Sequence, residues 1–171
     1  MPYCLKESGT EPQGPFRSIL MQHEGCYALV EAELRLGDIK ITLTLLERRV
    51  EETGRPYLDW LLCQLAASVP GFSGLFRWNV MPGELLRFAE DLNSLHKGFP
   101  EVTTVNFEPA EPKILLRFTI ARTGLIEGTY AVSSDLVRRA VLTGSFSMDQ
   151  SYLPGLVSAL RKFVRQATDA A

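Results

Sequence analysis

Short runs that alternate apolar and polar residues, separated by turn residues, constrain the fold of this chain more than any other feature. In residues 30–36 the apolar side chains fall at every second position, which is the period of a strand with one buried face. The same period returns in residues 39–45, after a turn at Gly37 and Asp38. The two runs predict a hairpin whose polar face brings Glu33 and Lys40 close enough to pair.

Residues 57–69, YLDWLLCQLAASV, fit either of two elements. The leucine spacing suits a helix, whereas a short apolar run bounded by turn residues suits a buried strand. We favour the strand, because the following PGFSG and LFRWNV look like a hairpin loop and its return strand. Three more alternating runs, at 113–122, 125–132 and 140–148, are joined by connections too short for parallel crossovers, so they predict an antiparallel meander.

Two amphipathic helices complete the predicted elements. The first spans residues 82–97, with Pro82 in its first turn and Gly98 as its C-terminal cap. His96 lies in the last turn and is interpreted as a capping residue rather than a catalyst, because the helix dipole favours positive charge there. The second helix carries cations in its closing turns, and these are Arg161, Lys162 and Arg165.

The stretch SMDQSY, residues 147–152, could form the polar mouth of an active site or only the start of the last helix. We favour the second interpretation. Ser151 is the predicted N-cap, which places Pro154 inside the first turn, where its missing N–H costs nothing. Asp149 and Gln150 then end the preceding strand and turn the chain into the helix.

These elements predict an α+β fold, a two-layer sandwich in which an antiparallel meander sheet carries two helices on one face. The length of 171 residues fits one domain. We expect a flexible N-terminal tail, rich in Pro and Gly, over residues 1–15. A single α+β domain is expected over residues 16–171.

Composition argues against several classes of function. The chain has 18 Lys and Arg against 20 Asp and Glu, a net charge of −2, so the concentrated positive charge that nucleic-acid binding needs is not expected. No apolar run is long enough to span a membrane. The three cysteines show no metal-binding spacing and are interpreted as reduced, which argues against a metal site and favours a cytoplasmic protein. No cofactor is expected.

No catalytic motif is present, and we expect no enzymatic activity. The G-x-S-x-G, P-loop, dinucleotide-binding and H-E-x-x-H patterns are all missing from the sequence. Glu108 and Glu111 are a possible acid–base pair, but carboxylates between prolines are usually part of a solvated loop. Four aromatic residues either line a ligand pocket or belong to the core, and we favour the core: Trp60, Trp78, Phe72 and Phe76.

The polar face of the predicted sheet is the candidate binding surface. Its mixture of charges suits a protein partner better than a small substrate, although it is also what a merely solvated face would show. The chain is expected to be a monomer or a homodimer. No catalytic or metal-binding residue is assigned, and the candidate partner-binding residues are Glu31, Glu33, Arg35, Lys40, Arg117 and Glu127.

Three segments taken in order resemble the WapI-type immunity proteins of bacterial polymorphic toxin systems. They are DWLLCQLAASVPGFSGLFRWNVMPGELLRFAEDLNSL, NFEPAEPKILLRFTIARTGLIEG and FSMDQSYLPGLVSALRKFV, and the resemblance covers about residues 27 to 166. It implies a non-enzymatic protein that binds and neutralises a cognate toxin domain in the cytoplasm, and it implies no catalytic residues. Two alternatives stay open, which are a small-ligand-binding α+β domain and a homo-oligomeric structural protein.

Overall fold

The strands form two four-stranded antiparallel sheets. The structure is a computed structural model that describes residues 29–133 and 141–169. In the first sheet the strands follow the order β1 (Glu31–Leu36), β2 (Ile39–Arg49), β3 (Trp60–Val69) and β4 (Phe72–Val80). In the second sheet the order is β5 (Thr104–Phe107), β6 (Ile114–Ile120), β7 (Leu125–Ser133) and β8 (Val141–Asp149).

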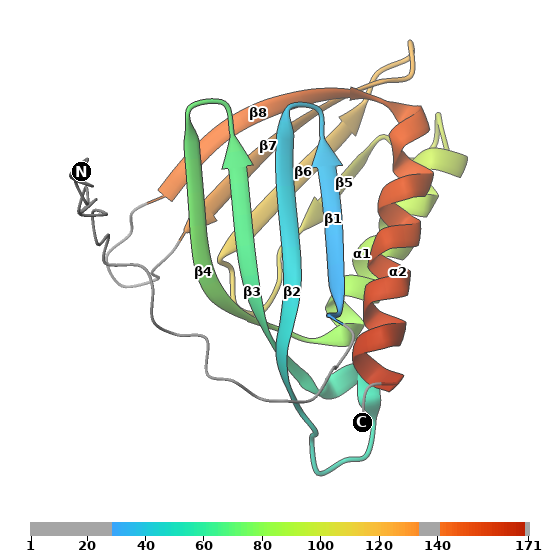
Figure 1. Cartoon of the computed structure of the whole chain (residues 1–171). Helices are drawn as coiled ribbons and strands as arrows, with labels where there is room; N and C mark the ends of the chain where they lie inside the picture. The colour runs from blue at the N-terminus through green and yellow to red at the C-terminus, as the bar shows by residue number, and fades with distance from the viewer. Residues whose placement is uncertain (1–28, 134–140, 170–171) are drawn as a thin grey trace, which may run out of the picture.

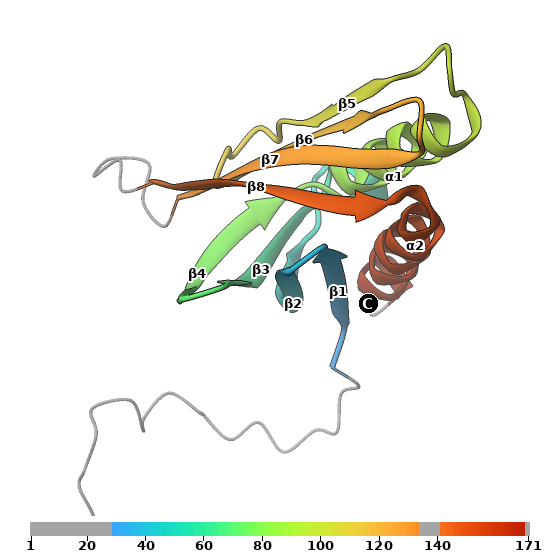
Figure 2. The same cartoon turned by 90° about the horizontal axis from the view of Figure 1, so that it is seen from above.

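Two helices, α1 (Pro82–Lys97) and α2 (Leu153–Asp169), pack against each other. Figure 1 shows the strands of the second sheet crossing obliquely behind those of the first, and Figure 2 shows the sheets as two layers with both helices along the same side. The predicted α+β class is confirmed. The meander divides into two sheets because α1 and its connection separate β4 from β5.

The predicted elements are found at nearly the predicted residues, with one strand missed. Residues 60–69 form a strand, as favoured over a helix, and α1 ends at Lys97 with Gly98 as its C-cap. β5 was not predicted, and it ends just before Pro109 and Pro112. The predicted tail over residues 1–15 lies outside the described residues.

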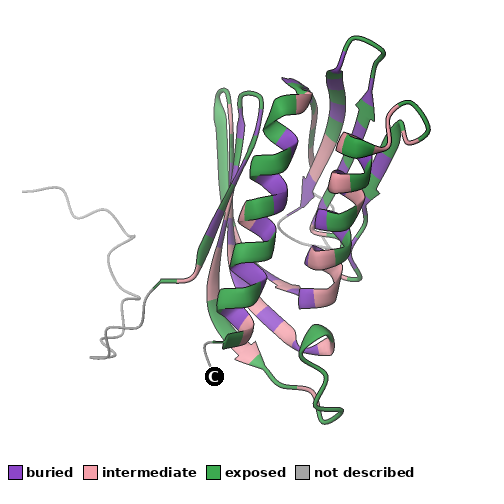
Figure 3. Ribbon diagram, turned by 90° about the vertical axis from the view of Figure 1, so that its right-hand side faces the viewer, coloured by how far each residue is buried: buried purple, intermediate pink, exposed green. Residues whose placement is uncertain are grey.

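A single hydrophobic cluster joins both sheets and both helices. Alternate residues of the strands face it, and each helix adds one buried stripe along its length, drawn in purple in Figure 3. Trp78 is among the most buried side chains, at 1% exposure, and its indole N–H donates to the backbone oxygen of Glu111 at 2.9 Å. Burying so many apolar side chains in one cluster is the main source of stability.

Among the described residues, three of the four edge strands are contacted by elements outside their own sheet. Helix α2 packs on β1, and α1 packs on β5. The β1–β2 turn packs against β8 so closely that a Cβ atom on Gly37, whose φ is +61°, would lie 2.5 Å from the backbone oxygen of Ser147. The edge strand β4 pairs with β3 alone among the described strands, and it exposes Phe72 and Leu75 at 67% and 63%.

The chain enters α2 through a single 3-10 turn, Gln150–Tyr152. The side chain of Asp149 accepts a hydrogen bond of 2.8 Å from the backbone N–H of Ser151, and this bond lowers the pKa of Asp149 below its ordinary value. Asp149 is therefore the capping residue, and the prediction of Ser151 as N-cap was wrong. The interpretation of Asp149 and Gln150 as the end of a strand and the entry to a helix is confirmed.

A buried ion pair ties the β2–β3 connection to the end of α2. Arg48 Nε and Nη2 each lie 2.8 Å from Asp59 Oδ2, and a further N–H of Arg48 donates to the backbone oxygen of Thr168. The pKa of Asp59 lies below its ordinary value, chiefly because the backbone N–H of Glu51 donates to Oδ1 at 3.0 Å, and also because Arg48 pairs with it. Burial opposes this shift. The hydrogen bond from Arg48 to Thr168 joins residues that lie 120 positions apart in the chain.

Candidate partner-binding surfaces

Four of the six candidate binding residues lie together on the outward face of the β1–β2 hairpin. Glu33 forms ion pairs of 2.6 Å with both Lys40 and Arg35, so the predicted pairing across the hairpin is confirmed. These two hydrogen bonds, first that of Lys40, hold the pKa of Glu33 below its ordinary value. Glu31 accepts a hydrogen bond of 2.8 Å from the hydroxyl of Thr44. The hairpin thus presents alternating acidic and basic side chains that pair with one another on its exposed face.

The other two candidates, Arg117 and Glu127, lie on the second sheet. Their side chains face outward from β6 and β7 and border a hollow of about 830 Å³. Asp38 and Pro70, in the turns of the first sheet, border the same hollow. The six residues were predicted on one open sheet face, and the structure distributes them over the outward faces of two sheets.

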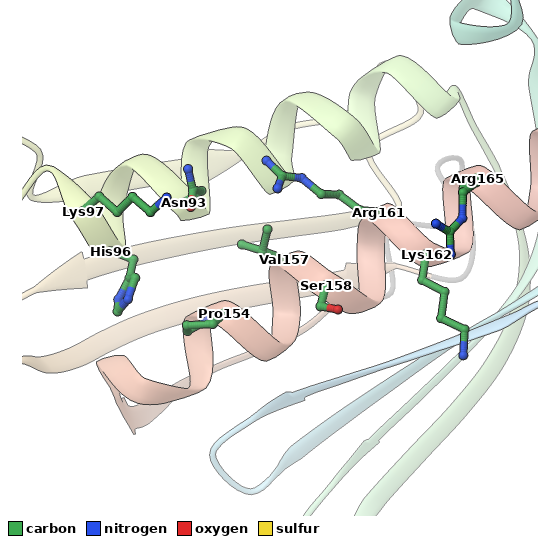
Figure 4. A pocket seen from close by; sticks show the side chains of 9 residues that line it. All are labelled: Asn93, His96, Lys97, Pro154, Val157, Ser158, Arg161, Lys162 and Arg165. Carbon is green, nitrogen blue, oxygen red and sulfur yellow. The ribbon is translucent and has the colours of Figure 1, made fainter.

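A groove of about 640 Å³ between α1 and α2 was not predicted. It is bordered by both helices (Figure 4) and holds a group of cations. Its lining residues are Asn93, His96, Lys97, Pro154, Val157, Ser158, Arg161, Lys162 and Arg165. The sequence gives each helix cations near its end, but helix-dipole reasoning explained each set separately. Only the packing of the two helices shows that both sets of cations border one groove.

The cations of this α1–α2 groove have no acidic partner within the described part of the chain. The ion pairs found there involve other cations, such as Lys113, and Lys97, Arg161, Lys162 and Arg165 form none. The Nδ1 atom of His96 is buried and likewise lacks a hydrogen-bond partner among the described residues. Desolvated polar atoms are normally paired, so this end of α1 has unused hydrogen-bonding capacity.

The possible acid–base pair of Glu108 and Glu111 has a structural explanation. Glu111 accepts a hydrogen bond of 2.8 Å from the backbone N–H of Asn79 and pairs with Lys113 at 3.0 Å, so it fastens the β5–β6 connection to β4. It is half-buried, and describing it as part of a solvated loop was wrong, whereas Glu108 is exposed. This arrangement uses Glu111 as a fixed acceptor.

The aromatic residues divide between core and surface. Trp78 is buried in the core, as we favoured, and Phe76 packs against it from a half-buried position. Trp60 is half-buried, but Phe72 is exposed at the start of β4, so its assignment to the core was wrong. Because Trp78 is enclosed by core side chains, it cannot border an open ligand pocket.

Comparison with known proteins decides the family. The model of the WapI-like immunity protein family matches residues 33–167, which include all eight strands and both helices almost completely. The chain belongs to the WapI-like immunity protein family. No curated protein sequence matches this WapI-like chain. A solved structure, the crystal structure of WHY1 from Arabidopsis thaliana, is similar over 83% of this chain and 86% of that chain, at 15% identity and a TM-score of 0.41.

Membership of the WapI-like family agrees with the predicted resemblance and indicates a role in binding a protein toxin. Among the described residues of this WapI-like protein, no three His, Cys, Asp or Glu side chains are grouped so as to hold a metal ion. Burial raises the pKa of the Cys63 thiol to about 12, so it is protonated at neutral pH and a weak nucleophile. Neither α1 nor α2 is long and apolar enough to cross a membrane.

Proposed function

We propose that this protein binds and neutralises a cognate toxin domain of a bacterial polymorphic toxin system, in the cytoplasm and without catalysing a reaction. The observation that carries the proposal is the family match over residues 33–167. That range takes in both sheets and both helices, so the inference concerns the whole described fold rather than one motif. A protein that acts by occupying its partner needs a rigid, complementary surface rather than reactive groups.

The outward face of the β1–β2 hairpin is the proposed primary contact surface. Glu33 is held by Lys40 and Arg35, so the side chains lose less conformational entropy when a partner binds than free side chains would. Alternating charges on such a face favour rapid encounter with a complementary partner and select against wrong ones. Arg117 and Glu127, on the second sheet, are proposed as a secondary part of the interface.

Growth rescue tests the function directly. The protein is co-expressed with the C-terminal domain of any large secreted protein encoded beside its gene, and growth and co-purification are measured. We expect the cells to grow and the two proteins to purify as a stable complex. Continued growth arrest, together with two separate species in size-exclusion chromatography, would show that the protein is not an inhibitor of this toxin.

A matched pair of charge reversals tests the surface. Glu33 and Glu47 are both exposed carboxylates that pair with an arginine two residues later, at 2.6 and 3.0 Å. Glu33→Lys is expected to weaken toxin binding about tenfold or more, mostly through slower association, and Glu47→Lys to leave it unchanged. Surface plasmon resonance separates the two rate constants. Equal toxin affinity of the two variants would show that the hairpin face is not part of the interface.

A further inference from the structure

We propose that the α1–α2 groove is a second contact site for the toxin and takes a segment rich in Asp and Glu. This inference rests on the proposed toxin-binding function and adds to it the chemistry of one partner segment. The groove is separate from the six residues considered above, which come from β1, β2, β6 and β7.

The first argument is the sign of the local charge. Lys97, Arg161, Lys162 and Arg165 border the groove, and no Asp or Glu does. Removing these four from the 18 Lys and Arg residues leaves 14 against 20 Asp and Glu in the rest of the chain. The groove is therefore a positive region on a protein that is otherwise acidic, and such local fields select partners of opposite sign.

The second argument is that the fold itself does not use these charges. Arg48 and Lys113 are paired with carboxylates, whereas the four groove cations form no ion pair within the described residues, as is also true of isolated exposed arginines such as Arg87. The groove differs in that four unpaired cations border one hollow. The helix dipole does not explain them all, because its effect is confined to the last turn. Arg161 and Lys162 lie about two turns before α2 ends at Asp169. Neighbouring like charges on a helix surface repel one another and slightly lower the stability of the fold. An acidic partner would remove this repulsion.

The third argument is the shape and lining of the groove, which favour a peptide over a nucleic acid. Side chains from both helices border it, with aliphatic surface from Val157 and Pro154 between the charges (Figure 4). None of its nine lining residues is Phe, Tyr or Trp. Sites for single-stranded nucleic acids usually stack bases on several such rings, whereas the half-buried imidazole of His96 is the one aromatic ring among these lining residues. Arginine guanidinium groups pair with carboxylates through two parallel hydrogen bonds, so Arg161 and Arg165 suit Asp and Glu side chains.

A pair of double variants with equal change in charge tests the proposal. Arg161→Glu/Arg165→Glu alters the groove, and Arg87→Glu/Arg122→Glu alters two exposed arginines outside it. Affinity for the toxin domain that the growth-rescue experiment identifies is measured by calorimetry at low and high salt. We expect the groove variant to bind about 30-fold or more weakly, with a smaller salt dependence, and the control variant to bind within about threefold of the unaltered protein. Thermal melting checks that both variants are folded. If Arg161→Glu/Arg165→Glu does not fold, the milder double variant Arg161→Gln/Arg165→Gln is used in its place.

The outcomes separate this inference from the proposed function. If the unaltered protein does not bind the toxin domain, both fail. If it binds and the groove variant binds equally well, the groove proposal is overturned while toxin binding stands. A fluorescein-labelled single-stranded RNA is titrated in parallel. Tight RNA binding that the groove variant loses, with toxin binding unchanged, would assign the groove to nucleic acid and refute an acidic protein segment.

Discussion

The Arg48–Asp59 pair gives the sharpest test of how the two ends of the fold are held together. The side chains are 12% and 1% exposed. Removing one member of a buried pair costs about 3–5 kcal/mol, because the remaining charge is left uncompensated. Asp59→Asn keeps an acceptor for the backbone N–H of Glu51, and Arg48 can still donate to the backbone oxygen of Thr168. We therefore expect a loss of unfolding free energy at the low end of this range, about 3 kcal/mol.

Urea denaturation measures this loss, and for a chain of this size it corresponds to a fall in melting temperature of about 6–12 °C. Arg48→Met removes the charge and keeps the aliphatic stem. The double variant Arg48→Met/Asp59→Asn is expected to lose less stability than the two single variants together, by about 1–3 kcal/mol. Single losses below about 1 kcal/mol that simply add would refute the claim that the pair is buried and coupled.

Acid provides an independent test of the same pair. The native pKa of Asp59 lies below the ordinary value of 3.8, so the native state stabilises the ionised form. This stabilisation is fully present above the unfolded pKa and is lost as pH falls through the native pKa. The difference in unfolding free energy between the unaltered protein and Asp59→Asn should therefore shrink as pH falls below about 4. A difference that stays constant would contradict the pKa assignment.

Two further predictions concern close packing. Gly37→Ala is expected to destabilise the protein by about 1–3 kcal/mol, as measured by urea denaturation, since φ is +61° and the new Cβ would lie 2.5 Å from the backbone oxygen of Ser147. Gly74→Ala is the control and should have little effect, because a Cβ atom there would have no neighbour within 4 Å. In a variant whose other two cysteines are serine, Cys63 should react with a disulfide reagent far more slowly when folded than in guanidinium, because the thiol is buried and its pKa is raised to about 12. Rapid labelling of the folded protein would contradict that burial.

Local sequence pattern predicted most of the elements, because strand and helix periods are visible wherever one face is buried. β3 was the hardest, since it is apolar on both sides: Leu61 and Leu65 face the core, and half-buried Leu62 faces away. Its bounding turns decided in favour of a strand. β5 was missed because it has only four residues, of which Val105 and Phe107 are buried, and so few residues show little alternation.

Arrangement in space was less accessible to sequence reasoning. Nothing in the local pattern says whether eight strands make one sheet or two, because that depends on which strands pair. Arg117 was for this reason grouped with Glu33, although they lie on different sheets. The cations of the α1–α2 groove were visible one helix at a time, and their proximity follows from helix packing. Ser151 was predicted as the N-cap in place of Asp149 because the 3-10 turn before α2 has no clear periodic signal.

The packing of α2 on β1 has a consequence for the synthesis of the protein. Each sheet is a meander of neighbouring strands and can pair progressively as the chain leaves the ribosome, because its contacts are local. The covered edge of β1 and the Thr168 partner of Arg48, however, exist only after residues 153–169 have emerged. The nascent chain therefore keeps part of its core exposed until the final helix is made. Maturation is completed after translation of that helix, and ribosome-bound chains stopped before residue 153 should remain sensitive to protease.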